Sequence, residues 1–172
     1  AQMYVMGTLL RHGSEEQKRH YLPQVADGRR RLQAFGVTEP TAGSETTSIA
    51  TRAVRDGDVY RVNGQKIWTS RALYSDLMIL LARTTPVDEV EHRLDGLSVF
   101  VVEMRDESGE LIPGLRIDPI ATWMNHNTTQ VFFDDVEIPA SSLIGTEGNG
   151  FRQILDGMNA ERILIAAECI GD

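Results

Sequence analysis

The chain has 172 residues, of which 41% are hydrophobic and 24% charged, a balance typical of a folded globular protein. Its net charge of -8 at pH 7 argues against a surface for nucleic acid or an anionic membrane, because neutralising phosphates needs clustered Lys and Arg. No segment approaches the roughly 20 consecutive apolar residues of a membrane-spanning helix.

The composition also limits redox and metal chemistry. Cys169 is the only cysteine, so no internal disulfide is expected, and the histidines include no pair at metal-ligand spacing. We therefore expect no metal site. The first residues lack the basic-then-apolar layout of a signal peptide, which favours a soluble intracellular protein.

Two helices are predicted at the N-terminal end. Apolar residues recur at helical spacing in the first ten residues, until Gly13 interrupts the pattern. Ser14 and Gln17 have the spacing of a capping box that opens a second helix, which Pro23 and Gly28 limit. This part resembles the end of a larger helical domain.

From Leu32 to about Leu143, short β-rich runs alternate with turn signals. Asp56-Gly57 and Asn63-Gly64 favour positive φ, and each predicts a tight hairpin. The segments DLMILLART, GLSVFVVEM and TTQVFFDDVEIP predict further strands, the second apolar enough to be buried on both faces. An antiparallel barrel or sandwich is the expected architecture.

After GTEGNG, interpreted as a hinge-like linker, helical spacing returns at Phe151 and continues to the end, with Gly157 as a locally weak point. The expected fold class is mainly β, with a barrel or sandwich middle domain flanked by helical segments. The predicted divisions are residues 1–31, 32–145 and 146–172.

The segment FGVTEPTAGSE ends a predicted strand and then turns. Pro40 forces the turn, Gly43 permits a close backbone approach, and Ser44 can direct its hydroxyl to a ligand. Free amides in such a turn suit an anion such as a pyrophosphate. A simple strand–turn–helix connection capped by Ser44 is the alternative for this segment taken alone.

A second polar feature lies on a later strand. Trp68 and Ser70 stand two residues apart, so both side chains should face the same side of the sheet. A large ring beside a hydroxyl group can form a wall for a flat, polar-edged heterocycle. A core tryptophan beside a surface serine is the alternative.

In order and separation, these segments resemble the acyl-CoA dehydrogenase family of flavoproteins. EEQKRHYLPQVADG is similar to the end of that family's N-terminal helical domain, FGVTEPTAGSE to its first flavin motif and VNGQKIWTSRA to its tryptophan-containing motif. TTQVFFDDVEIP is similar to its closing barrel strands, and GNGFRQILDGMNAERILIA to the first helix of its C-terminal bundle. The resemblance covers essentially the whole chain.

The resemblance implies FAD bound with its isoalloxazine ring against the β-domain. Val37 and Thr38 would bond the ring edge, Trp68 would stack on the ring, and Ser70 replaces a threonine that bonds the flavin N5 region. Residues 126–128 depart from the family pattern, so no contact is carried over there. The implied cofactor residues are Phe35, Val37, Thr38, Gly43, Ser44, Trp68 and Ser70.

Dehydrogenation of an acyl thioester also requires a carboxylate base for the α proton. Glu161, next to Arg162, resembles the base of isovaleryl and long-chain members, whereas in most other members the base lies in the C-terminal bundle, beyond Asp172. Both possibilities stay open, as does a simple surface ion pair between Glu161 and Arg162. The resemblance implies that Ser44, Asn159 and Arg162 bind the substrate.

The activity implied is oxidation of an acyl-CoA to the trans-2-enoyl-CoA in fatty acid β-oxidation, with electrons passed to an electron-transfer flavoprotein. A homodimer or homotetramer in the bacterial cytoplasm is expected, with the mitochondrial matrix as the alternative location. The alternatives in function are a non-catalytic, truncated β-module and an acyl-CoA oxidase or flavin monooxygenase of the same fold.

Overall fold

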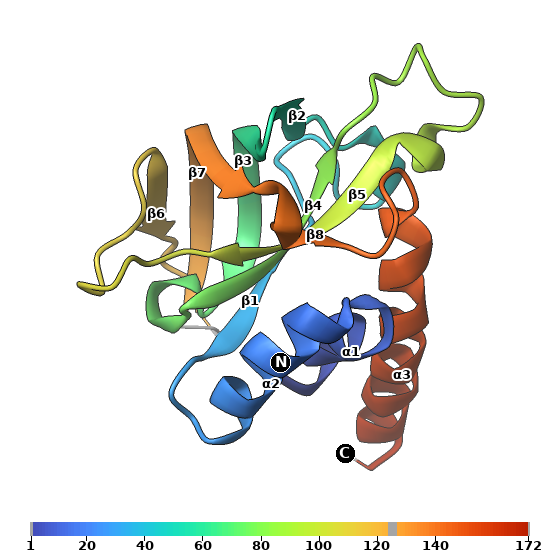
Figure 1. Cartoon of the computed structure of the whole chain (residues 1–172). Helices are drawn as coiled ribbons and strands as arrows, with labels where there is room; N and C mark the ends of the chain where they lie inside the picture. The colour runs from blue at the N-terminus through green and yellow to red at the C-terminus, as the bar shows by residue number, and fades with distance from the viewer. Residues whose placement is uncertain (1, 124–126, 172) are drawn as a thin grey trace.

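The computed structural model describes residues 2–123 and 127–171, and it places three helices along one side of a large sheet (Figure 1). The helices are α1 (Gln2–His12), α2 (Glu15–Ala26) and α3 (Gly150–Gly171). The strands are β1 (Leu32–Gly36), β2 (Arg52–Asp56), β3 (Val59–Ser70), β4 (Leu77–Arg83), β5 (Leu97–Glu103), β6 (Leu115–Pro119), β7 (Thr128–Pro139) and β8 (Leu143–Ile144).

The strands form one mixed, eight-stranded sheet with the order β6-β7-β3-β2-β4-β5-β8, and β1 pairs with β4 outside this path. The expected fold class, a mainly β part flanked by helical segments, is confirmed. The sheet is open and not a closed barrel, because in the described part of the chain the end strands β6 and β8 do not pair with each other. It is also not purely antiparallel, since β1 and β2 both run parallel to β4.

The strands β1 and β2 share one edge of β4. β1 pairs with β4 along Leu77–Leu80, and β2 meets β4 further on, at the pair Arg52–Arg83. The chain between these two strands therefore has to leave the edge of β4 before it returns. That connecting segment contributes Val37, Thr38, Gly43 and Ser44 to the candidate site described below.

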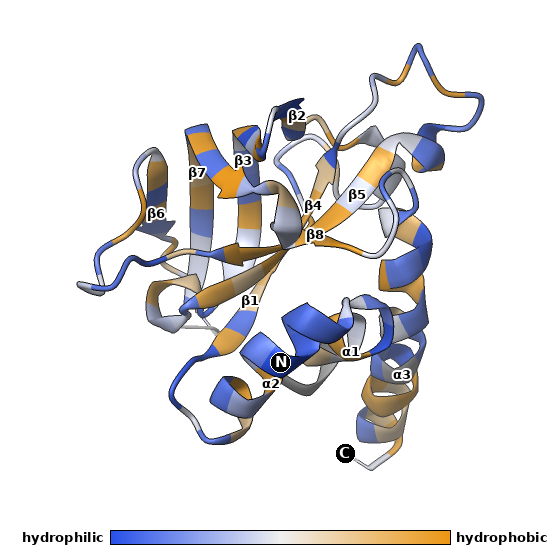
Figure 2. Cartoon of the chain, viewed as in Figure 1, coloured by the Kyte–Doolittle hydropathy of each residue, from blue (hydrophilic) through white to orange (hydrophobic). Residues whose placement is uncertain are grey.

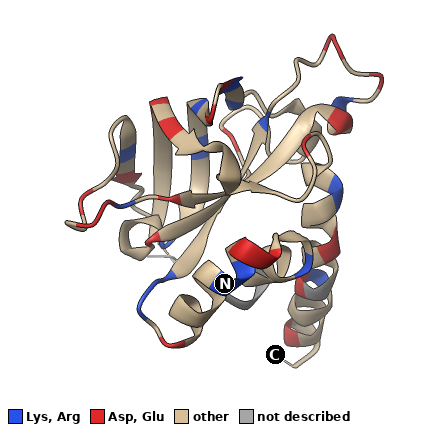
Figure 3. Cartoon of the chain, viewed as in Figure 1, with Lys and Arg blue, Asp and Glu red and all other residues tan. Residues whose placement is uncertain are grey.

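Two apolar clusters pack on opposite faces of β4 and β5. Both strands are largely orange in Figure 2, the colour of hydrophobic residues. On β4, Met78 and Leu80 point into a cluster with Tyr60 and Phe100, whereas Leu77 and Ile79 point to the helices. The prediction that GLSVFVVEM is buried on both faces is confirmed for β5, and β4 has the same burial. Charged residues lie mainly on the helices and loops (Figure 3).

The helices begin where the sequence indicates. The capping box is confirmed: Gln17 N–H donates to Ser14 Oγ, and the Gln17 side chain accepts from Ser14 N–H. Pro23, expected to limit the helix, lies inside it, and α2 continues to Ala26. No helix among residues 2–123 and 127–171 is long and apolar enough to cross a membrane.

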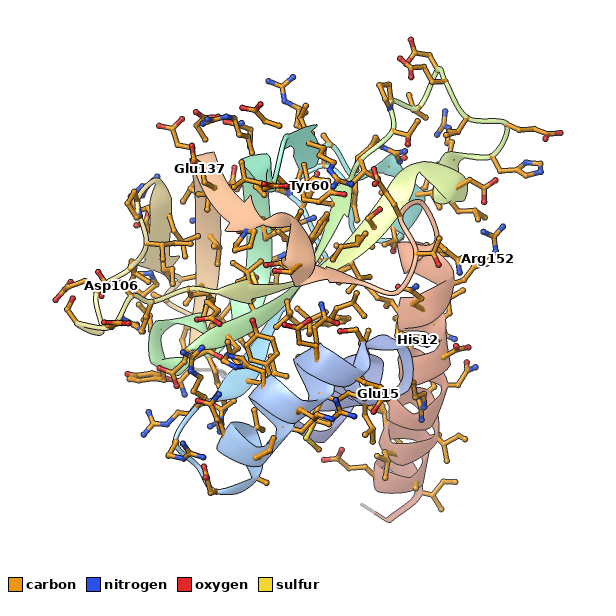
Figure 4. All side chains as sticks on the ribbon, in the orientation of Figure 1. His12, Glu15, Tyr60, Asp106, Glu137 and Arg152 are labelled. Carbon is orange, nitrogen blue, oxygen red and sulfur yellow. The ribbon has the colours of Figure 1, made fainter. Side chains whose placement is uncertain are left out.

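Contacts on α1 and in the loop before α3 fix the first half of that helix. Arg11 on α1 donates to the Asp156 carbonyl at 2.9 Å, and His12 Nε2 lies 3.1 Å from Asp156 Oδ2. Before its start, the Tyr60 hydroxyl donates to Glu147 Oε2 at 2.9 Å. His12 and Tyr60 are labelled in Figure 4, His12 beside α3 and Tyr60 over the sheet.

One of the two predicted hairpins is correct. Asp56-Gly57 turns β2 into β3, with Gly57 at φ +60 and Asp56 paired with Val59. The prediction for Asn63-Gly64 is wrong, because these residues lie inside β3, where the register with β7 shifts. Gly64 has φ +148, and a Cβ there would lie 2.5 Å from Thr51 Oγ1. The glycine serves close packing rather than a turn.

Gly64→Ala should lower the free energy of unfolding by about 2–4 kcal/mol, because it combines a forced steric overlap with an unfavourable backbone angle. Urea denaturation followed by circular dichroism measures this difference. Gly57→Ala is the matched control: a Cβ there meets nothing within 4 Å, so only the backbone cost of about 1 kcal/mol remains. Equal losses in the two variants would contradict the packing argument.

Candidate functional site

The two motifs that carry the resemblance meet directly in the structure. After β1 ends at Gly36, the chain crosses from β4 to β3, and the Thr38 carbonyl accepts a hydrogen bond from Ile67 N–H at 2.9 Å. Ile67 is the residue before Trp68, so the part of the first motif that follows β1 lies beside the tryptophan of the second. Trp68 is therefore close to Thr38, as a shared site requires.

A buried ion pair joins the same two segments. Lys66 Nζ lies 2.8 Å from Glu39 Oε1, and the exposed fractions of the two side chains are 0% and 4%. Lys66 Nζ also donates to the Val37 carbonyl at 3.0 Å, and Glu39 accepts from Ala50 N–H and Thr51 N–H at 2.7 and 2.9 Å. Burial of two charges is tolerated here because each has several hydrogen-bond partners.

The pair is charged at neutral pH. Burial lowers the pKa of Lys66 from 10.5 to about 8, because the attraction of Glu39 offsets only part of the loss of water. Burial alone would raise the pKa of Glu39, but the charge and hydrogen bond of Lys66, with the bonds from Thr51 and Ala50, bring it below its ordinary 4.5. Glu39 thus stabilises the fold above pH 4.5, and this contribution is lost as the pH falls through its lowered pKa.

Trp68 has an unusual backbone. Its φ is +60, and the register between β3 and β7 shifts between Lys66 and Thr69, which marks a bulge. The bulge interrupts the alternation between Lys66 and Thr69, whereas Trp68 and Ser70 flank the buried Thr69, so their placement on one side of the sheet stays a prediction. The indole is 57% exposed, so the core-tryptophan alternative is wrong, and Ser70 is half-buried. A left-handed residue of this size costs about 1–2 kcal/mol and persists only where the surroundings hold it.

The turn within the first motif is exposed on its outer side. Glu39 and Ala42 exchange backbone hydrogen bonds of 3.2 and 3.1 Å, and Gly43 and Ser44 are exposed beyond them. A Cβ on Gly43 would meet nothing within 4 Å, so a ligand can approach the backbone there. Ser44 caps no helix: the next helical turn starts at Thr46, and its N-cap Glu45 makes no side-chain cap bond.

The three predicted residues of α3 divide into two groups. Glu161 is half-buried and lines a small crevice with Thr8 of α1 and Phe35 of β1. Arg162 donates to Asn159 Oδ1 at 3.1 Å, and both are exposed. Arg162 thus has Asn159 and not Glu161 as its partner, which removes the simple ion-pair interpretation of Glu161. The departing residue 126 lies outside the described part of the chain.

Sequence reasoning missed Lys66 and Glu39. Alternation along β3 supplies the signal for Lys66, because Tyr60, Val62 and Lys66 share the buried face. A lysine on such a face needs an anion, and Glu39 is the acidic residue of the strand end that crosses to it. A pocket of about 740 Å³ between α2 and the ends of β5 and β7 contains none of the predicted residues.

Comparisons with known proteins identify the family of the chain. Residues 34–136 match the family described as "Acyl-CoA dehydrogenase, middle domain", and residues 1–29 match "Acyl-CoA dehydrogenase, N-terminal domain". FadE29 of Mycobacterium tuberculosis is 38% identical over 158 residues, which cover 92% of this chain and 38% of that protein. The mitochondrial long-chain specific acyl-CoA dehydrogenase of Sus scrofa is 35% identical over 162 residues, covering 94% of this chain and 36% of that protein.

Solved structures with a similar fold come from the same family. The crystal structure of an acyl-CoA dehydrogenase from Geobacillus kaustophilus superposes with a TM-score of 0.85 at 34% identity, covering 94% of this chain and 41% of that one. The chain therefore belongs to the acyl-CoA dehydrogenase family, a family of oxidoreductases. It spans 38% of the length of FadE29.

Lys66→Met should lower the free energy of unfolding at pH 7 by about 3–5 kcal/mol, because it leaves Glu39 buried and charged without its cation. The double variant Glu39→Gln/Lys66→Met should recover most of this loss. Urea denaturation measures both. Lys18→Met, which removes a partly exposed lysine paired with Glu15, is the control and should change stability by less than about 1 kcal/mol. A double variant no more stable than Lys66→Met would contradict the coupling of the two charges.

Proposed function

We propose that the protein is an FAD-dependent acyl-CoA dehydrogenase that oxidises an acyl-CoA thioester to the trans-2-enoyl-CoA and passes the electrons to an electron-transfer flavoprotein. The hydrogen bond from Ile67 N–H to the Thr38 carbonyl carries this proposal, because it brings an exposed indole beside the end of β1. Membership of the acyl-CoA dehydrogenase family supports the same class of reaction.

The residues at this junction fit a flavin. The 57% exposed indole of Trp68 offers a flat apolar surface, and the peptide groups and hydroxyls beside it offer donors for a polar ring edge. Bound there, FAD would supply the acceptor for the hydride from the substrate Cβ. Val37, Thr38 and Ser70 would bond the ring edge, Phe35 and Trp68 would contact the ring, and Gly43 and Ser44 would lie along the pyrophosphate.

For the base we propose Glu161. Its carboxylate is half-buried in the crevice that it shares with Phe35, on the helix packed beside the proposed ring site. A carboxylate so placed can accept the α proton of a thioester held between α3 and the sheet. Ser44, Asn159 and Arg162 would hold the CoA part, and Asn159 orients the Arg162 guanidinium through their 3.1 Å hydrogen bond.

The same proposal includes the domain organisation, the oligomeric state and the location of the protein. Residues 1–31, 32–145 and 146–172 would belong to the N-terminal helical, middle β and C-terminal helical domains of a homodimer or homotetramer. A place in fatty acid β-oxidation and a cytoplasmic location follow from the same family pattern, with the mitochondrial matrix as the alternative.

The purified protein, reconstituted with FAD, should show a bound flavin spectrum that bleaches when an acyl-CoA thioester is added without oxygen, since the substrate reduces the flavin. A panel of acyl chains of different length and branching then identifies the preferred substrate. A colourless protein would favour the non-catalytic alternative. Stoichiometric hydrogen peroxide under air would favour an oxidase.

Glu161→Gln should leave the flavin spectrum unchanged and slow the anaerobic bleaching by about 10²–10⁴-fold, the usual loss when a general base is removed. Stopped-flow absorbance measures the rate. Glu168→Gln, an exposed glutamate on the same helix, is the matched control and should bleach at the normal rate. A normal rate in Glu161→Gln would place the base on another residue.

A further inference from the structure

We propose that Lys66 is a positioning residue whose buried charge acts on the flavin ring through the Val37–Thr38 peptide, and so raises the reduction potential of the bound flavin. The inference rests on the proposed function, because it concerns the same site. Lys66 itself lies behind the strand end and is fully buried, so its effect on the ring would be transmitted by the backbone between them.

Through the Val37 carbonyl, Lys66 fixes the orientation of one hydrogen-bond donor, the Thr38 N–H. Lys66 Nζ donates to the Val37 carbonyl at 3.0 Å. In a trans peptide the C=O of Val37 and the N–H of Thr38 lie in one plane and point in opposite directions. The Thr38 N–H therefore points away from the ammonium, and within the described residues no chain atom accepts a hydrogen bond from it. Thr38 is half-buried, and we infer that this donor can reach a ligand.

The next peptide is held from the same strand. The Thr38 carbonyl accepts from Ile67 N–H at 2.9 Å, so two successive peptide planes are fixed by consecutive residues of β3. The Lys66 side chain is 0% exposed, and its ammonium is held by both the Val37 carbonyl and the Glu39 carboxylate. A ligand bonded to Thr38 thus meets a donor of fixed direction.

The charge of Lys66 adds to this orientation. A cation bonded to a carbonyl polarises the peptide, which strengthens the N–H of the same peptide as a donor. Because the ammonium is shielded from water, its field is weakly screened. Reduction adds negative charge to a flavin ring, so a fixed cation behind the donor stabilises the reduced form more than the oxidised form.

The choice of residues favours a role beyond packing. A buried ion pair can often be replaced by apolar residues of similar size without loss of stability. Glu39 contacts the Lys66 ammonium and the N–H groups of Ala50 and Thr51, whereas Lys66 alone contacts the Val37–Thr38 peptide. Removing the Lys66 charge should therefore lower the potential, whereas removing the Glu39 charge should not lower it. A purely structural role would lower the potential in both cases.

The test uses the whole protein loaded with FAD and compares Glu39→Gln, Glu39→Gln/Lys66→Met and Lys18→Met with the unaltered protein. Equilibration with a redox dye gives the potential, and fluorescence titration gives the dissociation constant of FAD. The double variant should show about a tenfold smaller ratio of reduced to oxidised flavin at a fixed dye potential, equivalent to about 30 mV for a two-electron couple. Glu39→Gln alone should raise the ratio or leave it unchanged, and Lys18→Met should not alter it.

Several outcomes decide the proposal. An unchanged reduction potential in the double variant would overturn it. Equal decreases of the potential in the double variant and in Glu39→Gln would overturn it too, because they would indicate that the site is distorted in both. Weaker FAD binding in the double variant than in Glu39→Gln would support the positioning role. Absence of FAD from the unaltered protein would overturn the proposed function itself, and this inference with it.

Discussion

The candidate site depends on one buried charge pair. Lys66 and Glu39 lie on segments that are distant in the sequence, and the side chains pack between the end of β1 and the middle of β3. Two ions removed from water are stable only when they meet each other and further hydrogen-bond partners. The ion pair therefore stabilises the arrangement in which the two segments meet, and this arrangement brings Thr38 beside Trp68.

The sheet explains why the segments have to meet. β1 and β2 occupy successive stretches of the same edge of β4, so the connecting chain cannot remain on that edge. It crosses to β3, where the bulge at Trp68 turns an indole outward instead of into the core. A break in strand regularity and a change of partner strand thus coincide, as is common where sheets carry binding sites.

Features that depend on neighbours in the sequence could be predicted, and features that depend on distant contacts could not. The capping box at Ser14 and the hairpin at Gly57 follow from a few adjacent residues, and both were predicted correctly. Gly64 is required because Thr51 packs against it, and the bulge at Trp68 depends on the register with β7. The family resemblance gave the site residues without this geometry, and neither Lys66 nor Glu39 was among them.

The depth of Lys66 also bears on how the molecule reaches its native state. An ammonium cannot enter an apolar interior until its carboxylate partner is in place, and Glu39 is held in turn by the amides of Ala50 and Thr51. If only one of the two segments were in place, Lys66 or Glu39 would be buried as an ion without its partner. We therefore expect the segments around the junction to become ordered together, so that the ligand-facing surface forms along with the interior behind it.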